Sequence, residues 1–166
     1  DHGFTLPDPR LTKELGIPNA CNRCHTNQTP DWSLAAMNQW FGPRTNELMR
    51  TRATAIAKAR AGDAAAVPAL LKMTEGETNF FWRAVAANLL QRWAAEPDVT
   101  AALLRCASDT NELARMAAVR GLEPLATSGF EPVVRTLNAR LADPVRAVRV
   151  AAAWAQRHTL DTNSPA

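Results

Sequence analysis

The stretch Val99-Thr100-Ala101-Ala102-Leu103 decides the fold, because related stretches recur on either side of it. One begins at Val67 and another at Val133, so the three starts are separated by nearly equal intervals. A fixed period of this size indicates stacked supersecondary units, none of which buries its apolar face alone. We therefore expect three paired-helix units that stack as a short α-solenoid.

The second helix of each expected unit is rich in alanine, which lets neighbouring helices approach closely. These helices carry Ala84-Val85-Ala86-Ala87, Met116-Ala117-Ala118-Val119 and Val150-Ala151-Ala152-Ala153. Before the middle one, Asp109-Thr110-Asn111-Glu112 resembles a capping box in which aspartate takes the serine or threonine role. Asp143 precedes the last one in a similar way. The pattern predicts an all-α fold.

Composition and charge exclude two classes of function. Hydrophobic residues make up 46% of the 166 residues. No apolar run approaches the roughly 18 residues of a membrane-spanning helix. The formal net charge is +3, with 19 Lys and Arg interleaved with 16 Asp and Glu. Nucleic-acid binding requires a concentrated basic stripe with aromatic platforms. We therefore expect no membrane span and no nucleic-acid partner, and we interpret the charges as solvated helix faces.

Before the repeats, Cys21-Asn22-Arg23-Cys24-His25 reads C-x-x-C-H, the attachment signature of a c-type haem. Two cysteines three positions apart lie on the same side of one helical turn. Each thiol can form a thioether bond to one vinyl group of the same porphyrin, and the imidazole of His25 can ligate the iron. We therefore predict one covalently bound haem c, held by Cys21 and Cys24, with His25 as the proximal ligand.

Three other uses of this motif are open. A C-x-x-C redox pair normally lies beside a βαβ unit, and nothing in the sequence indicates one. A zinc site needs about four ligands, whereas Cys21, Cys24 and His25 supply three. A disulfide between the two cysteines would close a small strained ring. The remaining thiol, Cys106, shares a helix face with apolar residues, so we expect it to be buried.

Two segments differ in character along the chain. Residues 1–30 lack helical periodicity and are punctuated by proline and glycine, which suits an ordered loop around a cofactor with at most one short turn. Thr29 is a good N-cap for the helix that follows, and Gly42-Pro43 ends that helix. We therefore predict a haem-binding segment at residues 1–43 and a helical-repeat domain at residues 44–166.

The aromatic residues divide between these segments. Trp32 and Trp40 lie eight positions apart on one helical face, soon after the haem motif. We expect at least one of them to pack against the porphyrin, which would exclude water and raise the reduction potential of the haem. The others fit packing in the core or at the edge of the solenoid: Phe80, Phe81, Trp82, Trp93 and Trp154.

Five stretches carry a resemblance to a known family: Asp1-His2-Gly3-Phe4-Thr5-Leu6-Pro7-Asp8-Pro9, Gly16 to His25, Trp32 with Trp40-Phe41-Gly42, Ala59 to Asp63, and Ala142 to Arg149. Together they resemble the end of the cytochrome part of bacterial multihaem c-type cytochromes that continue into HEAT-like repeats. The resemblance covers nearly the whole chain and implies that the solenoid is HEAT-like. The family carries several C-x-x-C-H motifs and often tetratricopeptide repeats, whereas this chain has one such motif and no tetratricopeptide repeat. It therefore fits either a last haem segment with repeats or a separate single-haem subunit.

The resemblance also implies a second axial ligand for the iron. The family's H-x-F-x-x-P pattern, which stands here at residues 2–7, makes His2 the expected distal ligand. Met37, on the helix that carries Trp40, is the alternative, and His158 is expected at the surface. A bis-histidine haem has a lower reduction potential than a methionine-ligated one.

We expect an electron carrier rather than an enzyme, because a six-coordinate haem has no open iron position for a substrate. The solenoid would dock onto other cytochromes or redox proteins, as in a multihaem complex. Two alternatives stay open: a scaffold whose haem is mainly structural, and a haem sensor or peroxidase-type protein. Covalent haem attachment takes place outside the cytoplasm in bacteria, so we expect a periplasmic or other extracytoplasmic location. The start at Asp1 without a signal peptide indicates a processed form or a fragment.

Overall fold

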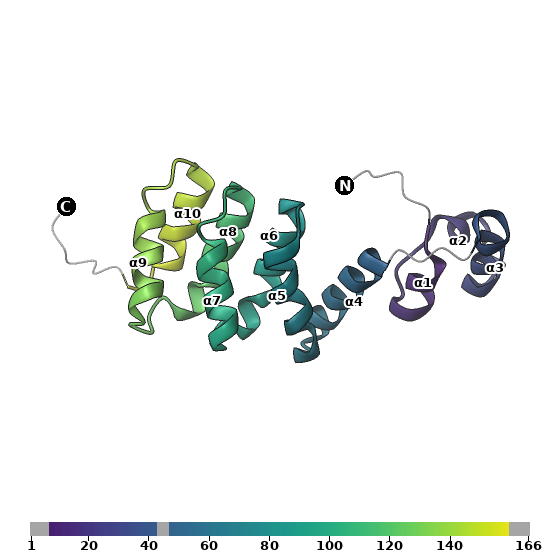
Figure 1. Cartoon of the computed structure of the whole chain (residues 1–166), viewed down its shortest axis with the longest axis horizontal. Coiled ribbons are helices and arrows are strands. Elements are labelled where there is room, and N and C mark those ends of the chain that lie inside the picture. Colours follow the sequence, from purple (N-terminus) through teal and green to yellow (C-terminus); the bar gives the residue numbers. More distant parts are fainter. Residues whose placement is uncertain (1–6, 43–46, 160–166) are drawn as a thin grey trace. The chain divides into compact units, whose positions relative to one another are not determined.

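A computed structural model describes residues 7–42 and 47–159. Within these ranges the secondary structure is helical, which confirms the all-α fold class (Figure 1). The chain divides into two compact units, Asp1–Ala57 and Lys58–Ala166, and the helix α4 (Glu47–Ala61) spans the boundary between them. The domain boundary that the sequence predicts, between residues 43 and 44, lies outside the described residues.

Three short helices precede α4 in the first unit: α1 (Pro9–Leu15), α2 (Ala20–Cys24) and α3 (Pro30–Phe41). α3 packs against both α1 and α2. The helix predicted after Thr29 is confirmed, because the Thr29 hydroxyl oxygen accepts a hydrogen bond from the Trp32 N–H at 3.2 Å. The helix ends at Gly42, whose φ of 73° lies in the region that favours glycine.

Residues 7–24 are more helical than the sequence analysis predicts. A loop with one turn is expected there, but α1 and α2 form because each has its own cap. The Asp8 side chain accepts a hydrogen bond from the Arg10 N–H at 3.1 Å, and Pro9 occupies the first helical position. Asn19 caps α2 in the same way. These contacts are local, so even short helices begin at defined residues.

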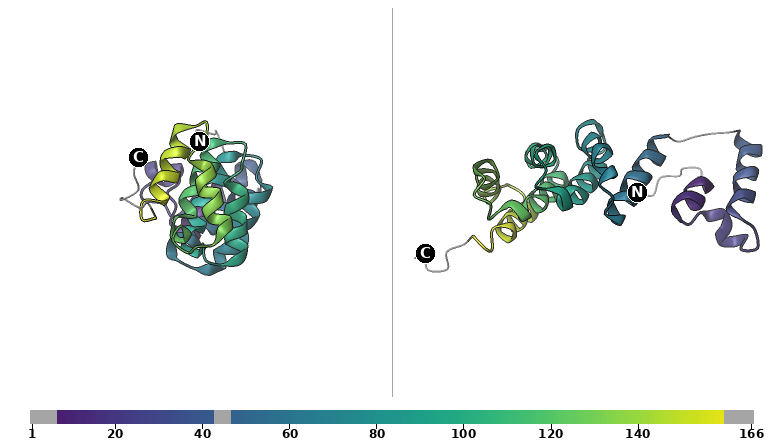
Figure 2. Two further views of the ribbon diagram at one scale, coloured as in Figure 1. Left: turned by 90° about the vertical axis from the view of Figure 1, so that its left-hand side faces the viewer. Right: turned by 90° about the horizontal axis from the view of Figure 1, so that it is seen from below.

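The second unit contains three helical pairs where the sequence predicts them. α5 (Val67–Gly76) pairs with α6 (Phe80–Leu90), α7 (Pro97–Cys106) with α8 (Glu112–Gly121), and α9 (Glu131–Arg140) with α10 (Arg146–Ala155). A 3₁₀ turn precedes each pair: η1 (Ala64–Ala66), η2 (Gln91–Trp93) and η3 (Glu123–Leu125). Within this unit α5, α7 and α9 form one row and α6, α8 and α10 a second, as Figures 1 and 2 show.

Small and aliphatic side chains form the core between the two rows. The largest fully buried ones are Leu70, Leu90, Leu103, Leu122, Leu137, Val99, Val119, Val133 and Val148. The close approach of α6 and α8 depends on Gly121. A Cβ atom at this position would lie 2.8 Å from Leu103 Cδ2 and 3.2 Å from the carbonyl oxygen of Ala87.

The predicted capping box at residues 109–112 is wrong. α8 is capped by Asn111, whose side-chain oxygen accepts a hydrogen bond from the Leu113 N–H at 2.9 Å. Asp109 lies earlier, and its Oδ1 accepts a hydrogen bond from the Asn111 N–H at 2.8 Å. Asp143 occupies the same place before α10, where it accepts from the Val145 N–H at 3.0 Å. Both aspartates shape the loops before the second helices instead of capping those helices.

The surface of the second unit carries several aromatic residues that the sequence analysis places in the core or at its edge. Phe80, Phe81 and Trp154 have exposed fractions of 45%, 42% and 61%. These three are surface residues, not core residues. In the described ranges no helix combines the length and the apolar character that crossing a membrane requires.

Candidate functional site

The C-x-x-C-H motif lies on α2 and at its C-terminal end. The Asn19 side chain accepts a hydrogen bond from the Asn22 N–H at 3.0 Å and so begins the helix. The helix ends at His25, whose N–H donates to the Cys21 carbonyl oxygen at 2.9 Å. Cys21 is half-buried, Cys24 and His25 are exposed, and neither thiol forms a disulfide. One turn therefore presents two free thiols and an imidazole.

Asn22, inside the motif, fastens this turn to α3. Its Nδ2 donates to the Gln28 carbonyl oxygen at 2.9 Å, and its Oδ1 accepts from the Ser33 hydroxyl at 2.9 Å. Asn19 Nδ2 donates to the same Oδ1 at 2.9 Å and to the Thr12 hydroxyl at 2.7 Å. Ser33 is 1% exposed and Asn19 7%. The sequence analysis misses this cluster. Its one local signal in the sequence is Asn19, which stands directly before α2.

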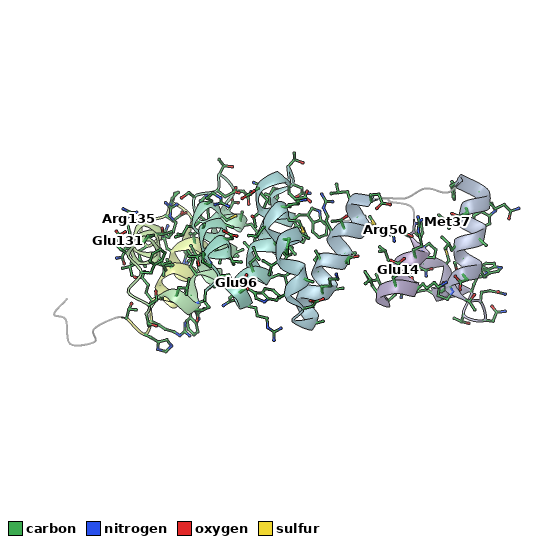
Figure 3. The ribbon with its side chains drawn as sticks, turned by 60° about the horizontal axis from the view of Figure 1, so that its bottom comes forward. Glu14, Met37, Arg50, Glu96, Glu131 and Arg135 are labelled. Atoms are coloured by element: carbon green, nitrogen blue, oxygen red, sulfur yellow. The ribbon has the colours of Figure 1, made fainter. Side chains whose placement is uncertain are left out.

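Trp32 lies beside the motif, on the first turn of α3. Its ring centroid is 5.0 Å from that of His25, and the two ring planes are tilted by 51°. Trp40, near the other end of α3, packs edge to face against Phe41 at 6.4 Å. Of the two tryptophans predicted near the porphyrin, the structure brings Trp32 to the motif. Met37, the alternative iron ligand, is half-buried on α3 between them (Figure 3).

Residues 7–42 bury few apolar side chains of their own. Leu11 and Pro9 are buried. The exposed fractions of the following side chains lie between 38% and 66%: Ile17, Trp32, Trp40 and Phe41. Segments this small usually need a metal, a disulfide or a partner in order to be stable. Two free thiols, an imidazole and uncovered aromatic rings are the groups that hold and surround a c-type haem, so the residues present fit this cofactor.

The sequence analysis makes predictions for three other residues, of which the structure describes two. His2, the predicted distal ligand, lies outside the described residues. Cys106 is buried as predicted, and this burial raises the pKa of its thiol. His158 is exposed as predicted, but it lies beyond the end of α10. Within the described ranges, no group of three or more His, Cys, Asp or Glu side chains is placed to hold a metal ion.

The second unit contains a repeated ion pair that the sequence analysis misses. Arg83 on α6 donates from Nε and Nη2 to the two carboxylate oxygens of Asp109, at 2.7 and 2.9 Å. Arg115 on α8 binds Asp143 in the same way, at 2.9 and 3.0 Å. Arg115 is 9% exposed and Asp143 3%. The interpretation of the charges as solvated helix faces is therefore wrong for these residues.

Each of these arginines also holds the loop before its own helix. Arg83 Nη1 donates to the carbonyl oxygens of residues 77 and 78, at 2.8 and 3.2 Å. Arg115 Nη1 donates to those of residues 109 and 110, at 2.9 and 3.0 Å. One guanidinium thus joins two backbone carbonyls of its own helical pair to a carboxylate of the next pair.

The contacts favour the charged forms of both partners. The hydrogen bond from Arg83 lowers the pKa of Asp109 despite partial burial. Burial of Asp143 acts to raise its pKa, but hydrogen bonds from Arg115 and from the Val145 N–H outweigh it, so the pKa is lowered. Hydrogen bonds to the aspartates raise the pKa of both arginines. The pairs therefore remain ionised at neutral pH.

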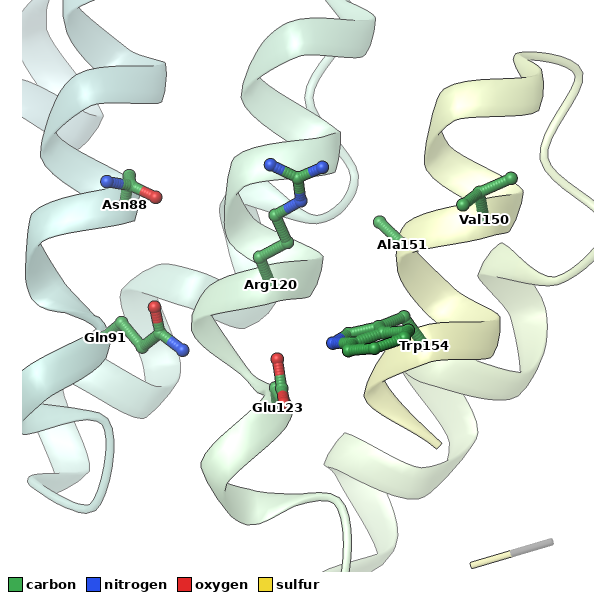
Figure 4. A pocket seen from close by; sticks show the side chains of 7 residues that line it. All are labelled: Asn88, Gln91, Arg120, Glu123, Val150, Ala151 and Trp154. Atoms are coloured by element: carbon green, nitrogen blue, oxygen red, sulfur yellow. The ribbon is translucent and has the colours of Figure 1, made fainter. Parts of the chain in front are cut away.

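A shallow groove lies between α6, α8 and α10 (Figure 4). Asn88, Arg120 and Trp154 are among its lining residues, one from each helix. Trp154 also lies under the Arg157 guanidinium, 4.5 Å from the ring centroid, and Arg157 pairs with Glu123 at 2.5 Å. The residues that line the groove on the α6 and α8 sides are polar, whereas α10 lines it with Val150, Ala151 and Trp154.

Comparison with known proteins finds no matching family model, no matching curated protein and no matching solved structure.

Proposed function

We propose that this chain carries one c-type haem, attached through Cys21 and Cys24, and that it transfers electrons. The observation that supports this most strongly is the single turn that presents two free thiols and the His25 imidazole beside Trp32. When bound, the haem supplies one-electron redox chemistry. The residues of the chain attach it, ligate its iron and limit the access of water.

Each residue of the site has a separate part in this proposal. His25 would ligate the iron from the end of α2, and the hydrogen bonds of Asn22 hold that turn against α3. Trp32 covers one side of the imidazole. His2 is proposed as the residue that would supply the second protein ligand of the iron, which would leave no open iron position. A six-coordinate iron suits a carrier better than an enzyme.

We further propose that the helical pairs form a short α-solenoid of HEAT-like repeats that docks onto another cytochrome or redox protein. Two features support this proposal. The stretches that begin at Val67, Val99 and Val133 recur at nearly equal intervals, and the arginine–aspartate contact recurs between successive pairs. Since bacteria attach c-type haem outside the cytoplasm, we propose a periplasmic location.

The test is to produce the chain in a host that matures c-type cytochromes and to record its intact mass and its optical spectrum. We expect a mass increase of one haem and the spectrum of a haem joined by two thioether bonds. Replacing both Cys21 and Cys24 by alanine should abolish this increase, whereas Cys106→Ala should retain it. A properly matured chain that is colourless and has only the mass of its polypeptide would rule out the proposal.

A second measurement separates a carrier from a sensor or a peroxidase-type protein. The reduced protein of a six-coordinate carrier should bind carbon monoxide slowly or not at all, and it should exchange electrons rapidly with a small redox mediator. Rapid binding of carbon monoxide would indicate an open iron position. Slow electron exchange would favour a haem with a structural role.

A further inference from the structure

Arg149 on α10 occupies the position in the third helical pair that Arg83 and Arg115 occupy in the first two. The intervals between these three arginines match those between Val67, Val99 and Val133. Its Nη1 donates to the carbonyl oxygens of Asp143 and Pro144, at 2.8 and 3.0 Å, as the other two arginines do in their own loops. Its Nε and Nη2, which in those arginines bind an aspartate, have no acceptor within the described part of the chain.

Apolar residues near Arg149 are also more exposed than the equivalent residues of the first two helical pairs. Ala87 on α6 and Val119 on α8 are both 0% exposed. The equivalent residue of α10, Ala153, is exposed. Val150 is 57% exposed, whereas its equivalent on α6, Ala84, is 5% exposed. Met116, the equivalent of Val150 on α8, is half-buried. The face of α10 that carries Arg149, Val150 and Ala153, hereafter the open face, is therefore more exposed than the equivalent faces of α6 and α8.

We propose that the open face is a docking surface for a partner protein that presents a helical hairpin with an aspartate in the loop before its second helix. The Arg83–Asp109 and Arg115–Asp143 contacts show which group completes such a guanidinium: a carboxylate that accepts from Nε and Nη2 together. Charge-assisted bidentate pairs of this kind combine strength with a defined orientation.

The occupant has to be a helical hairpin rather than a small anion, because the open face is apolar beside the arginine. An anion would satisfy Arg149 and leave Val150 and Ala153 in water, whereas a packed helix would bury them. A second copy of this chain is disfavoured, since the two aspartates with the required loop position, Asp109 and Asp143, are already paired. The proposal goes beyond electron transfer and does not depend on the haem.

The first test measures binding of a designed probe to the full chain. The probe is a helical-repeat protein whose first, uncapped hairpin carries the loop Asp-Pro-Val-Arg, copied from residues 143–146, and a matched probe has asparagine in place of that aspartate. We expect the aspartate probe to slow amide hydrogen exchange in α10 and to bind roughly ten times more tightly than the asparagine probe. Equal binding of the two probes, or no binding of either, would overturn the proposal.

The second test alters the chain. Ala153→Glu places a bulky carboxylate on the open face one turn after Arg149, so it should weaken binding of the aspartate probe at least about tenfold. Ala139→Glu makes the same change at an exposed position of α9 and should bind like the unaltered chain. Since both alanines are exposed, the helical circular-dichroism signal and Tm should be kept in both variants. Unchanged binding by Ala153→Glu, or self-association of the chain through α10, would contradict the proposed partner.

Discussion

The guanidinium of Arg115 binds both carboxylate oxygens of Asp143, with Nε–Oδ2 and Nη2–Oδ1 distances of 2.9 and 3.0 Å. The two residues belong to successive helical pairs, and the Asp143 side chain is fully buried. The same carboxylate accepts the Val145 N–H at the start of the next helix. A single ion pair therefore joins α8 to the loop that begins α10.

Loss of this pair should destabilise the second unit strongly. Arg115→Ala removes the two-point contact and leaves the buried Asp143 carboxylate with only Arg140, whose Nη1 lies 3.3 Å from Oδ2, as a charged partner. We therefore expect the free energy of unfolding to fall by about 3 kcal/mol. Arg105→Ala removes an exposed ion pair with Glu75 and should cost less than about 1 kcal/mol. Urea unfolding followed by circular dichroism measures both values. Similar losses in the two variants would show that burial adds nothing to the Arg115 contact.

Acid should weaken the fold through Asp109 and Asp143, whose pKa values are lowered in the folded state. In the unfolded chain an aspartate has a pKa of about 3.9. Below that pH the unfolded state binds more protons, so this contribution to stability is present above about pH 4 and is lost as the pH falls through the folded-state pKa. The free energy of unfolding of Asp143→Asn should therefore fall less steeply with acidification than that of the unaltered chain.

The control for this pH dependence is Asp98→Asn, which changes an exposed aspartate on α7. Its slope of unfolding free energy against pH should match that of the unaltered chain. If Asp143→Asn keeps the full slope as well, the lowered pKa of Asp143 does not contribute to acid unfolding.

Gly121→Ala should destabilise the contact between α6 and α8. The added Cβ would lie 2.8 Å from Leu103 Cδ2 and 3.2 Å from a backbone oxygen that cannot move away easily, so we expect a loss of about 1–3 kcal/mol. Gly76→Ala is the matched control, because nothing lies within 4 Å of the Cβ that it adds at the end of α5. There the better helix propensity of alanine should leave stability unchanged or raise it by up to about 1 kcal/mol. Thermal unfolding distinguishes the two, and an unchanged Tm in Gly121→Ala would mean that the helices separate without cost.

The two residues between the cysteines should differ in importance. Asn22→Ala removes the hydrogen bonds to Gln28 and Ser33, so we expect a loss of about 1–2 kcal/mol and less haem-loaded protein after maturation. Arg23→Ala alters an exposed side chain of the same turn and should change neither. Intact mass gives the loaded fraction, and proteolysis of the first unit gives its stability. Equal yields and equal protease resistance would mean that the Asn22 cluster does not hold the turn.

If the chain carries the proposed haem, the spectrum of the oxidised protein identifies the second protein ligand of the iron. With His2 as ligand we expect no sulfur-to-iron charge-transfer band and a low reduction potential. His2→Ala should then open the iron to carbon monoxide, whereas Met37→Ala should leave the spectrum and the potential unchanged. A sulfur-to-iron band that persists in His2→Ala and disappears in Met37→Ala would assign Met37 instead.

Local rules predict much of the helical order. Thr29 and Pro30 mark the start of α3, Gly42 marks its end, and the spacing of the valines locates α5, α7 and α9. The prediction for residues 7–24 is less successful, because α1 and α2 are too short to show an apolar period. Their starts depend on single side-chain caps, those of Asp8 and Asn19.

The buried ion pairs are the main feature that the sequence analysis misses. Arg83, Arg115 and Arg149 recur at the same intervals as the helices that carry them, so a signal is present in the sequence. The overall charge pattern does not reveal the buried ion pairs, because interleaved arginines and acids normally lie on solvated helix faces. Recognition requires comparing equivalent positions across the repeat rather than charges along one helix.

The sequence by itself determined the order of the helices, their period and the grouping of two thiols and an imidazole in one short motif, because these properties depend on neighbours along the chain. Only the tertiary structure decided which charges are buried, which tryptophan lies beside His25 and which face of α10 is left uncovered. These properties depend on side chains that come within a few ångströms of one another only after helices pack, and residues such as Arg115 and Asp143 are far apart in the unfolded chain.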